Sequence, residues 1–149
     1  MCVLYGHSGG NKKKEKAANT IQLATAIKAE HDAQPSGPTL IMGDFNMEAR
    51  DITPFRELIE EEMWMDVGEH ANLWGETPGG YTCVTGQSKK TSRIDFILAS
   101  PVAIPIITGF RVLHNEPFPT HAVLQIKLDA KHIVHKFTSS RSRHLYTLV

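Results

Sequence analysis

The sequence predicts an α/β layered sandwich, and three features of the chain lead to this fold class. Residues 12–31 and 53–63 carry apolar side chains at the spacing of amphipathic helices. Short apolar segments separated by turn residues, which are typical of strands, dominate the second half of the chain. A length of 149 residues is enough for one domain and too short for two of ordinary size. Helices followed by closely spaced strands favour layers of helix packed on sheet.

The first half of the chain predicts two strands that flank a long helix. Residues 2–5 form a short apolar run that ends at a glycine, and residues 39–42 form a second one. Between them, residues 12–31 are strong helix formers with a lysine-rich start that is expected to face solvent.

A second helix is predicted after the second strand. Thr53 is the expected N-cap, because its hydroxyl can accept a backbone N–H, and Pro54 suits the first helical position. The apolar side of this helix is expected to comprise Phe55, Leu58, Ile59 and Met63.

The second half of the chain predicts an irregular stretch followed by strands. Residues 66–80 are rich in turn formers. The expected strands are 81–84, 94–99, 104–113 and 122–128. Residues 1–128 are therefore assigned to one domain, and residues 129–149 to a basic, flexible tail.

Composition and charge exclude several classes of protein. Sixteen basic residues balance sixteen acidic ones, so there is no global positive field, and binding to nucleic acid would need a local patch. The two cysteines, Cys2 and Cys83, are too few for a disulfide framework or a four-cysteine zinc site. No apolar run approaches the roughly 18 residues of a membrane span, and the start lacks the basic flank of a secretory signal. The sequence predicts an intracellular protein of the cytoplasm or nucleus that is not secreted.

Two polar residues directly follow the second predicted strand, in the tetrapeptide from Gly43 to Asn46. Asp44 and Asn46 are two positions apart, so their side chains point the same way if the chain stays extended. A carboxylate and an amide aimed at one point can orient a water molecule and bind a phosphoryl oxygen. An Asx-type turn explains the same pattern without any chemistry, so both interpretations remain open.

Asp95 lies inside the apolar segment 94–99, where a carboxylate is costly unless it is paired. A structural ion pair with Arg93 is one interpretation, and a more distant partner is the favoured one. His121, directly before the last predicted strand, is a natural partner. A carboxylate that binds one imidazole nitrogen fixes the tautomer, and the other nitrogen can then donate to a phosphate. A purely structural histidine is the alternative.

Tyr5 ends the first predicted strand, and its hydroxyl can donate to a phosphate oxygen. An ordinary half-buried strand aromatic explains this residue equally well.

Taken together, these motifs resemble the endonuclease/exonuclease/phosphatase superfamily, which includes the DNase I-like nucleases. The residues that carry the resemblance are the G-D-F-N motif at 43–46, the S-R-I-D-F motif at 92–96, His121 and Tyr5. The likeness extends from Leu4 to Leu128. It implies a partial four-layer α/β/β/α sandwich that uses Mg²⁺ (or Mn²⁺) to hydrolyse a phosphoester, possible substrates being nucleic acid or a small phosphoester.

The resemblance also implies a role for each site residue. Asp44 would position or deprotonate the attacking water, and Asn46 would bind the phosphate. Asp95 would hold His121, which hydrogen-bonds the phosphoryl oxygens, and Tyr5 would contact the same phosphate. The metal would be bound weakly by Asp44 and Asn46.

Two departures from the family pattern limit these expectations. Thr120 stands where the family's third motif has a carboxylate. The family's N-terminal half brings an early Asn and a Gln-Glu pair whose Glu is the principal metal ligand, and nothing before Tyr5 matches it. We therefore expect a C-terminal half of the domain, with the N-terminal half missing and apolar sheet surface uncovered. Such a chain is expected to be poorly stable or to self-associate, which size-exclusion chromatography tests.

Three functions remain open at this point. The leading hypothesis is a nuclease-like, Mg²⁺-dependent phosphodiester hydrolase. The others are a catalytically inactive remnant or interaction module of the same fold, and a phosphatase for inositol or lipid phosphates. The sequence does not distinguish DNA, RNA and small phosphoesters as substrates.

Overall fold

A four-stranded sheet lies at the centre of the protein. The computed structural model describes residues 1–6, 14–33, 37–85, 89–114, 120–129 and 131. The strand order is β1-β2-β6-β3, in which β1 (Cys2–Tyr5) runs parallel to β2 (Leu40–Asp44). β6 (Asp95–Ala99) is antiparallel to both β2 and the short β3 (Met65–Asp66). The sheet is therefore mixed, with β6 in its interior.

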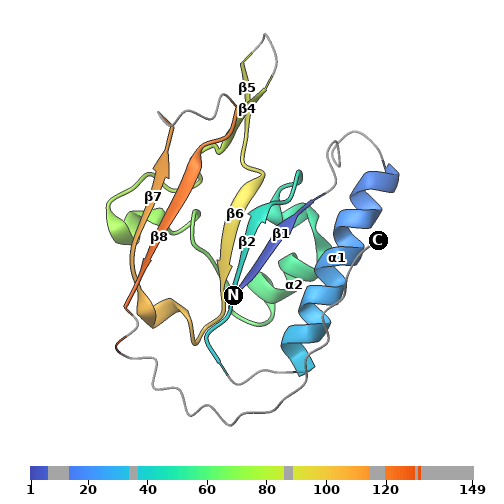
Figure 1. Cartoon of the computed structure of the whole chain (residues 1–149), viewed down its shortest axis with the longest axis horizontal. Coiled ribbons are helices and arrows are strands. Elements are labelled where there is room, and N and C mark those ends of the chain that lie inside the picture. The colour runs from blue at the N-terminus through green and yellow to red at the C-terminus, as the bar shows by residue number, and fades with distance from the viewer. Residues whose placement is uncertain (7–13, 34–36, 86–88, 115–119, 130, 132–149) are drawn as a thin grey trace.

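Two helices cover one face of this sheet (Figure 1). They are α1 (Lys14–Ala33) and α2 (Thr53–Glu60), with the short 3-10 turn η1 (Ala49–Asp51) before α2. The rings of Phe45 and Phe96 stack with centroids 4.1 Å apart, and Phe55 from α2 meets Phe45 edge-on at 5.2 Å. Such aromatic pairs add to the apolar area that each ring buries. This core fixes the strand ends from which the polar residues project.

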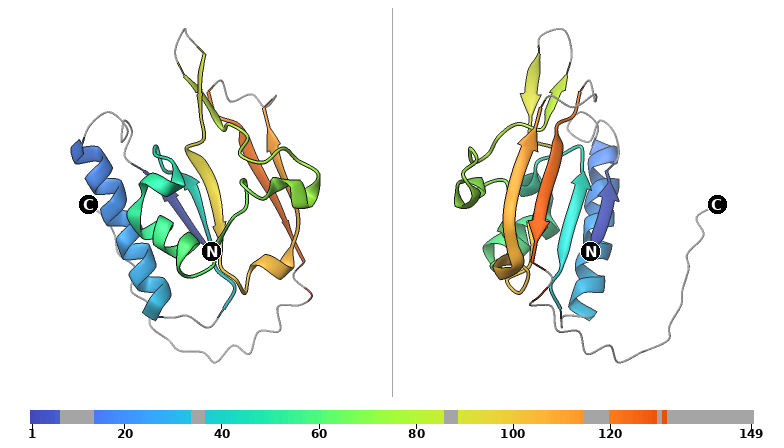
Figure 2. Two further views of the ribbon diagram at one scale, coloured as in Figure 1. Left: turned by 180° about the vertical axis from the view of Figure 1, so that it is seen from behind. Right: turned by 60° about the vertical axis from the view of Figure 1, so that its left-hand side comes forward.

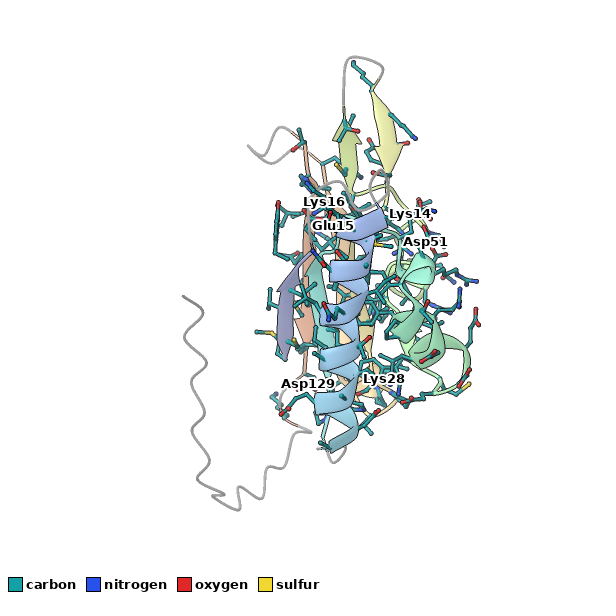
Figure 3. The ribbon with its side chains drawn as sticks, turned by 90° about the vertical axis from the view of Figure 1, so that its right-hand side faces the viewer. Lys14, Glu15, Lys16, Lys28, Asp51 and Asp129 are labelled. Atoms are coloured by element: carbon teal, nitrogen blue, oxygen red, sulfur yellow. The ribbon has the colours of Figure 1, made fainter. Side chains whose placement is uncertain are left out.

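Charged residues of α1 lie on its outer side and at its end. Lys14 and Glu15 are exposed at the start of the helix, as predicted for its lysine-rich beginning (Figure 3). Lys28 forms ion pairs with Asp32 on the same helix and with Glu62 just after α2, so it links the two helices. In the described part of the chain, no helix is long and apolar enough to cross a bilayer.

A two-stranded antiparallel sheet packs on the opposite face of the central sheet (Figure 2). It consists of β7 (Ile107–Leu113) and β8 (Val123–Leu128), and it is preceded by the 3-10 turn η3 (Ile104–Ile106). A further 3-10 turn, η2 (Ala71–Trp74), contributes to the same apolar cluster. The fully or nearly buried members of this cluster are Leu40, Val67, Ala71, Ile97, Ala99, Ala103, Ile107 and Phe110.

A hairpin extends beyond the central sheet. It is formed by β4 (Cys83–Thr85) and β5 (Lys90–Ser92), which are antiparallel (Figure 1). An isolated bridge between Cys83 and His121 connects the base of this hairpin to the segment before β8.

The layer order of helix, sheet and sheet confirms the predicted α/β sandwich, and in the described residues it makes up three layers of an α/β/β/α arrangement. Among the described residues, the β7–β8 sheet packs over β2 and β6 and does not cover the edge strand β1. Val3 and Tyr5 are accordingly 67% and 69% exposed. Self-association through this surface remains a prediction. Apart from 129 and 131, the predicted tail lies outside the described residues.

Several element boundaries differ from the sequence prediction for local reasons. Ile52, not Thr53, is the N-cap of α2. Met63 does not belong to the apolar side of that helix, because it follows the helix end with φ 58° and is 74% exposed. The predicted strand 104–113 begins only at Ile107, because Pro105 lacks a backbone N–H and the chain forms the 3-10 turn η3 there. The predicted strand 81–84 forms instead at Cys83–Thr85.

Candidate active site

Two carboxylates face each other at one end of the central sheet. Asp44 ends β2 and Asp95 begins β6, and the two residues are direct cross-strand partners. Directly paired residues project from the same face of a sheet, so the two side chains are neighbours, and each is only 13% exposed. Two like charges in this position destabilise the fold unless other groups compensate them.

The backbone around Asp44 is held from both sides. The N–H of Gly6 donates to the carbonyl of Asp44 (2.6 Å), and the N–H of Phe45 donates to the carbonyl of Ile94 (2.8 Å). Gly43 has φ +151°, and a Cβ there would lie 1.8 Å from the carbonyl oxygen of Leu4. Glycine at this position therefore allows β1 to approach β2 closely.

Asn46 does not continue the strand, so the condition of extended geometry from Asp44 to Asn46 is not met. Its φ is 53°, in the left-handed region that asparagine tolerates. Its backbone N–H donates to Oδ1 of Asp44 (2.9 Å), and its Nδ2 donates to the carbonyl of Gly6 (3.1 Å). This is the Asx-type turn of the alternative interpretation. The turn orients the Asp44 carboxylate and fixes the Asn46 side chain beside it.

The structure brings His121 to Asp95. Nδ1 of His121 lies 3.0 Å from Oδ2 and 3.2 Å from Oδ1 of Asp95, so the Asp95 carboxylate accepts the imidazole N–H. The other ring nitrogen, Nε2, lies 4.0 Å from Oδ2 of Asp44. The imidazole thus stands between the two carboxylates, with 35% of its side chain exposed.

A buried threonine, Thr82, supports the pair of Asp95 and His121. The sequence did not predict this role. The hydroxyl of Thr82 accepts the N–H groups of Ile94 (3.2 Å) and Asp95 (3.0 Å), and Thr82 is 2% exposed. The carbonyl of Thr82 accepts the N–H of Ala122 (2.7 Å), next to His121. One residue therefore ties the Asp95 strand to the His121 segment.

Tyr5 and Thr120 contribute less directly. Tyr5 pairs with Asp44 in the β1–β2 register, so its side chain leaves the same face of the sheet, where it is 69% exposed. Thr120 is exposed, and its carbonyl accepts the N–H of Val84 (2.8 Å). This backbone hydrogen bond extends the Cys83–His121 bridge that positions His121.

Cys83 is a further residue of the site that sequence reasoning did not assign. Its Sγ lies 3.8 Å from Nε2 of His121, and the residue is 1% exposed. Burial, followed by the nearby charge of Asp95, raises the pKa of the Cys83 thiol. The thiol is therefore protonated near neutral pH and is a poor nucleophile in this state.

Arg93 does not pair with Asp95. This agrees with the favoured interpretation, which gave Asp95 a more distant partner. Its Nη1 and Nη2 bind the two carboxylate oxygens of Asp66 (3.0 and 2.7 Å), and Nη2 also binds Oε1 of Glu69 (2.8 Å). This network ties the start of the Asp95 segment to the loop after β3.

The electrostatics of Asp44 are set mainly by its burial. Desolvation raises the pKa of Asp44, the N–H of Asn46 acts in the opposite direction, and the nearby charge of Asp95 raises it further. A bound cation would reverse this penalty, because it favours the ionised carboxylate.

The donor atoms at this end of the sheet fit a divalent cation. One atom from each of Asp44, Asp95 and His121 can be chosen so that all lie within 4.8 Å of one another. Carboxylate oxygens suit hard divalent cations and an imidazole suits softer ones, so the donor set does not identify the ion, and the Asp95 oxygens are engaged by Nδ1 of His121. The role of Asn46 as a metal ligand, which the sequence suggested, remains a prediction.

Comparison with known proteins identifies the family. Residues 17–140 match the Endonuclease/Exonuclease/phosphatase family, and the chain belongs to it. No curated protein sequence matches the chain.

Solved structures of this family share the fold. The 3'-5' exonuclease NExo from Neisseria meningitidis superposes with a TM-score of 0.64 and 19% identity over 85% of this chain. The 3' phosphatase NExo from Neisseria bound to a product DNA hairpin gives a TM-score of 0.64, 18% identity and 85% coverage of this chain. The catalytic domain of Xenopus laevis APE2 gives 0.66 and 15% over 85% of this chain. The chain spans 60% of the length of both NExo structures and 48% of the APE2 domain.

Proposed function

We propose that this chain carries the phosphate-binding and water-activating part of a divalent-metal-dependent phosphodiester hydrolase that acts on nucleic acid. The observation that carries the proposal is the cluster of Asp44, Asp95 and His121, in which a carboxylate-bound imidazole faces a second, buried carboxylate. Family membership supports hydrolysis of a phosphoester, and the DNA hairpin bound by one structural relative supports a nucleic-acid substrate.

The residues of the cluster divide the work between them. Oδ1 of Asp44 accepts the Asn46 N–H, which leaves Oδ2 on the side of His121 to accept a proton from the attacking water. Because Asp95 holds Nδ1, the imidazole presents Nε2 to a phosphoryl oxygen and can donate to it when protonated. Tyr5, on the same face, would contact that phosphate. Asp44 and Asn46 would hold the Mg²⁺ or Mn²⁺, which when bound would stabilise the negative charge of the transition state.

The test is cleavage of end-labelled oligonucleotides by the purified chain. A DNA hairpin with a 3' overhang, the same sequence in RNA, and an inositol phosphate are each incubated with Mg²⁺ or Mn²⁺ and with a chelator. We expect metal-dependent cleavage of nucleic acid that falls by about 10²–10⁴-fold in Asp44→Asn and in His121→Ala. Asp51→Asn is the matched control, since Asp51 is an exposed aspartate in η1, outside the cluster.

Three results would reject the proposal. Cleavage that persists in both variants would place the chemistry elsewhere, and binding of the hairpin without cleavage would favour the interaction module. Release of phosphate from the inositol phosphate alone would favour the phosphatase.

A further inference from the structure

Cys83 is a soft donor at the edge of a site built from hard ones. Its Sγ lies 3.8 Å from Nε2 of His121, and the same nitrogen lies 4.0 Å from Oδ2 of Asp44. Mg²⁺ prefers oxygen ligands and does not use a thiol, so the proposed hydrolysis gives Cys83 no role. Thiolate and imidazole together are instead the donors preferred by Zn²⁺ and related cations.

The orientation of His121 supports a metal on the sulfur side of the ring. Metal-binding histidines usually donate their other ring N–H to a carboxylate, which fixes the ring and makes the ligating nitrogen more basic. Asp95 provides this support, with Oδ2 3.0 Å from Nδ1. In the tautomer that results, Nε2 carries the lone pair, and Cys83 and Asp44 are the side chains near it.

The separation of the two donors matches a tetrahedral zinc site. With bonds of about 2.3 Å to sulfur and about 2.1 Å to nitrogen, tetrahedral geometry separates the two ligand atoms by about 3.6 Å. The observed distance from Sγ to Nε2 is 3.8 Å. Only a shift of a few tenths of an ångström is needed, which the side chains can provide.

The backbone holds this pair in place. Cys83 and His121 form an antiparallel bridge, so their side chains leave the same face. On either side of the bridge, Val84 donates to the carbonyl of Thr120 (2.8 Å) and Ala122 donates to that of Thr82 (2.7 Å). The donors are therefore preorganised by two segments far apart in the sequence.

We propose that Cys83 and His121 bind a thiophilic divalent cation such as Zn²⁺ through Sγ and Nε2, with water completing the shell. The thiol proton leaves to solvent as the sulfur–metal bond forms, and no electron is transferred. If the proposed function holds, a metal bound at Nε2 prevents this nitrogen from donating to phosphate, so the cation inhibits hydrolysis.

The test measures metal binding directly and does not depend on activity. Co²⁺ is added to the reduced, purified chain, and its tetrahedral d–d bands and its sulfur-to-cobalt charge-transfer band are recorded, with displacement by Zn²⁺. We expect both signals in the wild-type chain. Cys83→Ser should abolish the charge-transfer band and weaken Zn²⁺ binding by about tenfold or more. His121→Ala should weaken binding to a similar extent.

The chain offers its own control. Cys2→Ser changes the other cysteine, which lies on β1 and is partly exposed, and should leave both signals unchanged. Far-ultraviolet circular dichroism establishes that each variant is folded. A charge-transfer band that persists in Cys83→Ser, that disappears in Cys2→Ser, or that is absent from the wild-type chain overturns the proposal. Failure of hydrolysis with these bands intact would reject only the proposed function.

Discussion

The Arg93 network offers two carboxylates at nearly equal distance from one nitrogen but with very different exposure. Nη2 of Arg93 lies 2.7 Å from Oδ2 of Asp66 and 2.8 Å from Oε1 of Glu69. The Asp66 side chain is 4% exposed and that of Glu69 is 40% exposed, while the Arg93 side chain is 13% exposed. The distances from Nη2 do not separate the two pairs, whereas burial, together with the second contact of Asp66 to Nη1, predicts the larger contribution from Asp66.

Asp66→Ala should destabilise the fold strongly. Removing one member of a buried ion pair typically costs about 3–5 kcal/mol, because the other charge stays buried without compensation. Glu69 retains one contact with Arg93, so we expect the lower end, about 3 kcal/mol. The variant also loses the hydrogen bond from the N–H of Gly68 to Oδ1 of Asp66 (3.1 Å), which adds to the cost. Glu69→Ala should cost only about 0–1 kcal/mol, as is usual for exposed pairs.

Urea unfolding followed by circular dichroism measures both variants against the wild-type chain. A loss of about 3 kcal/mol corresponds to a melting temperature lower by about 10 °C for a domain of this size. Equal losses in the two variants would refute the argument from burial. A smaller loss in Asp66→Ala than in Glu69→Ala would reverse it.

Three further predictions concern the site. Burial raises the pKa of Asp44, so the folded chain binds the carboxyl proton more tightly than the unfolded chain. The stability that Asp44 contributes therefore falls as the pH rises from the pKa of the unfolded chain through that of the folded chain. In chelator, Asp44→Asn should therefore melt higher than wild type at pH 7, a difference that shrinks towards acidic pH and is checked by melting curves across pH. Gly43→Ala should cost more than about 4 kcal/mol in urea unfolding, because the new Cβ would lie 1.8 Å from the Leu4 carbonyl oxygen at φ +151°. Thr82→Val removes the hydroxyl that accepts two backbone N–H groups and should cost about 1–3 kcal/mol, measured by thermal unfolding beside Thr85→Val on the exposed end of β4.

Local patterns were sufficient to predict much of the fold. The strand at residues 2–5 was predicted at its observed bounds, and the long helix and the core of β6 within a few residues, because each has the apolar period of its element. The short β3 and β5 were not predicted. Met65–Asp66 and Lys90–Ser92 have too few residues to show a period, and they are strands only because a neighbour pairs with them.

The site was only partly predictable for the same reason. Asp95 could be identified as unusual because a carboxylate interrupts an apolar run, and His121 before the last predicted strand was a natural partner for it. Cys83 and His121 are 38 positions apart in the sequence, and Asp66 and Arg93 are 27 apart. The pairing of strands brings the members of each pair together. Register depends on which strands meet in three dimensions, and no local pattern contains that information.

The conformation at Asn46 shows how a structural and a functional interpretation can both hold. From the sequence, an Asx-type turn and a functional pair of Asp44 and Asn46 were alternative interpretations. In the structure, the turn is what aims the Asp44 carboxylate: its Oδ1 is held by the Asn46 N–H, and its Oδ2 remains on the side of His121. The destabilising approach of Asp44 to Asp95 is likewise compensated in part by His121, whose Nδ1 lies 3.0 Å from Asp95. In this cluster, His121 stabilises Asp95, whereas Asp44 stays desolvated. A bound cation would stabilise the ionised Asp44, and this argument does not depend on the family resemblance.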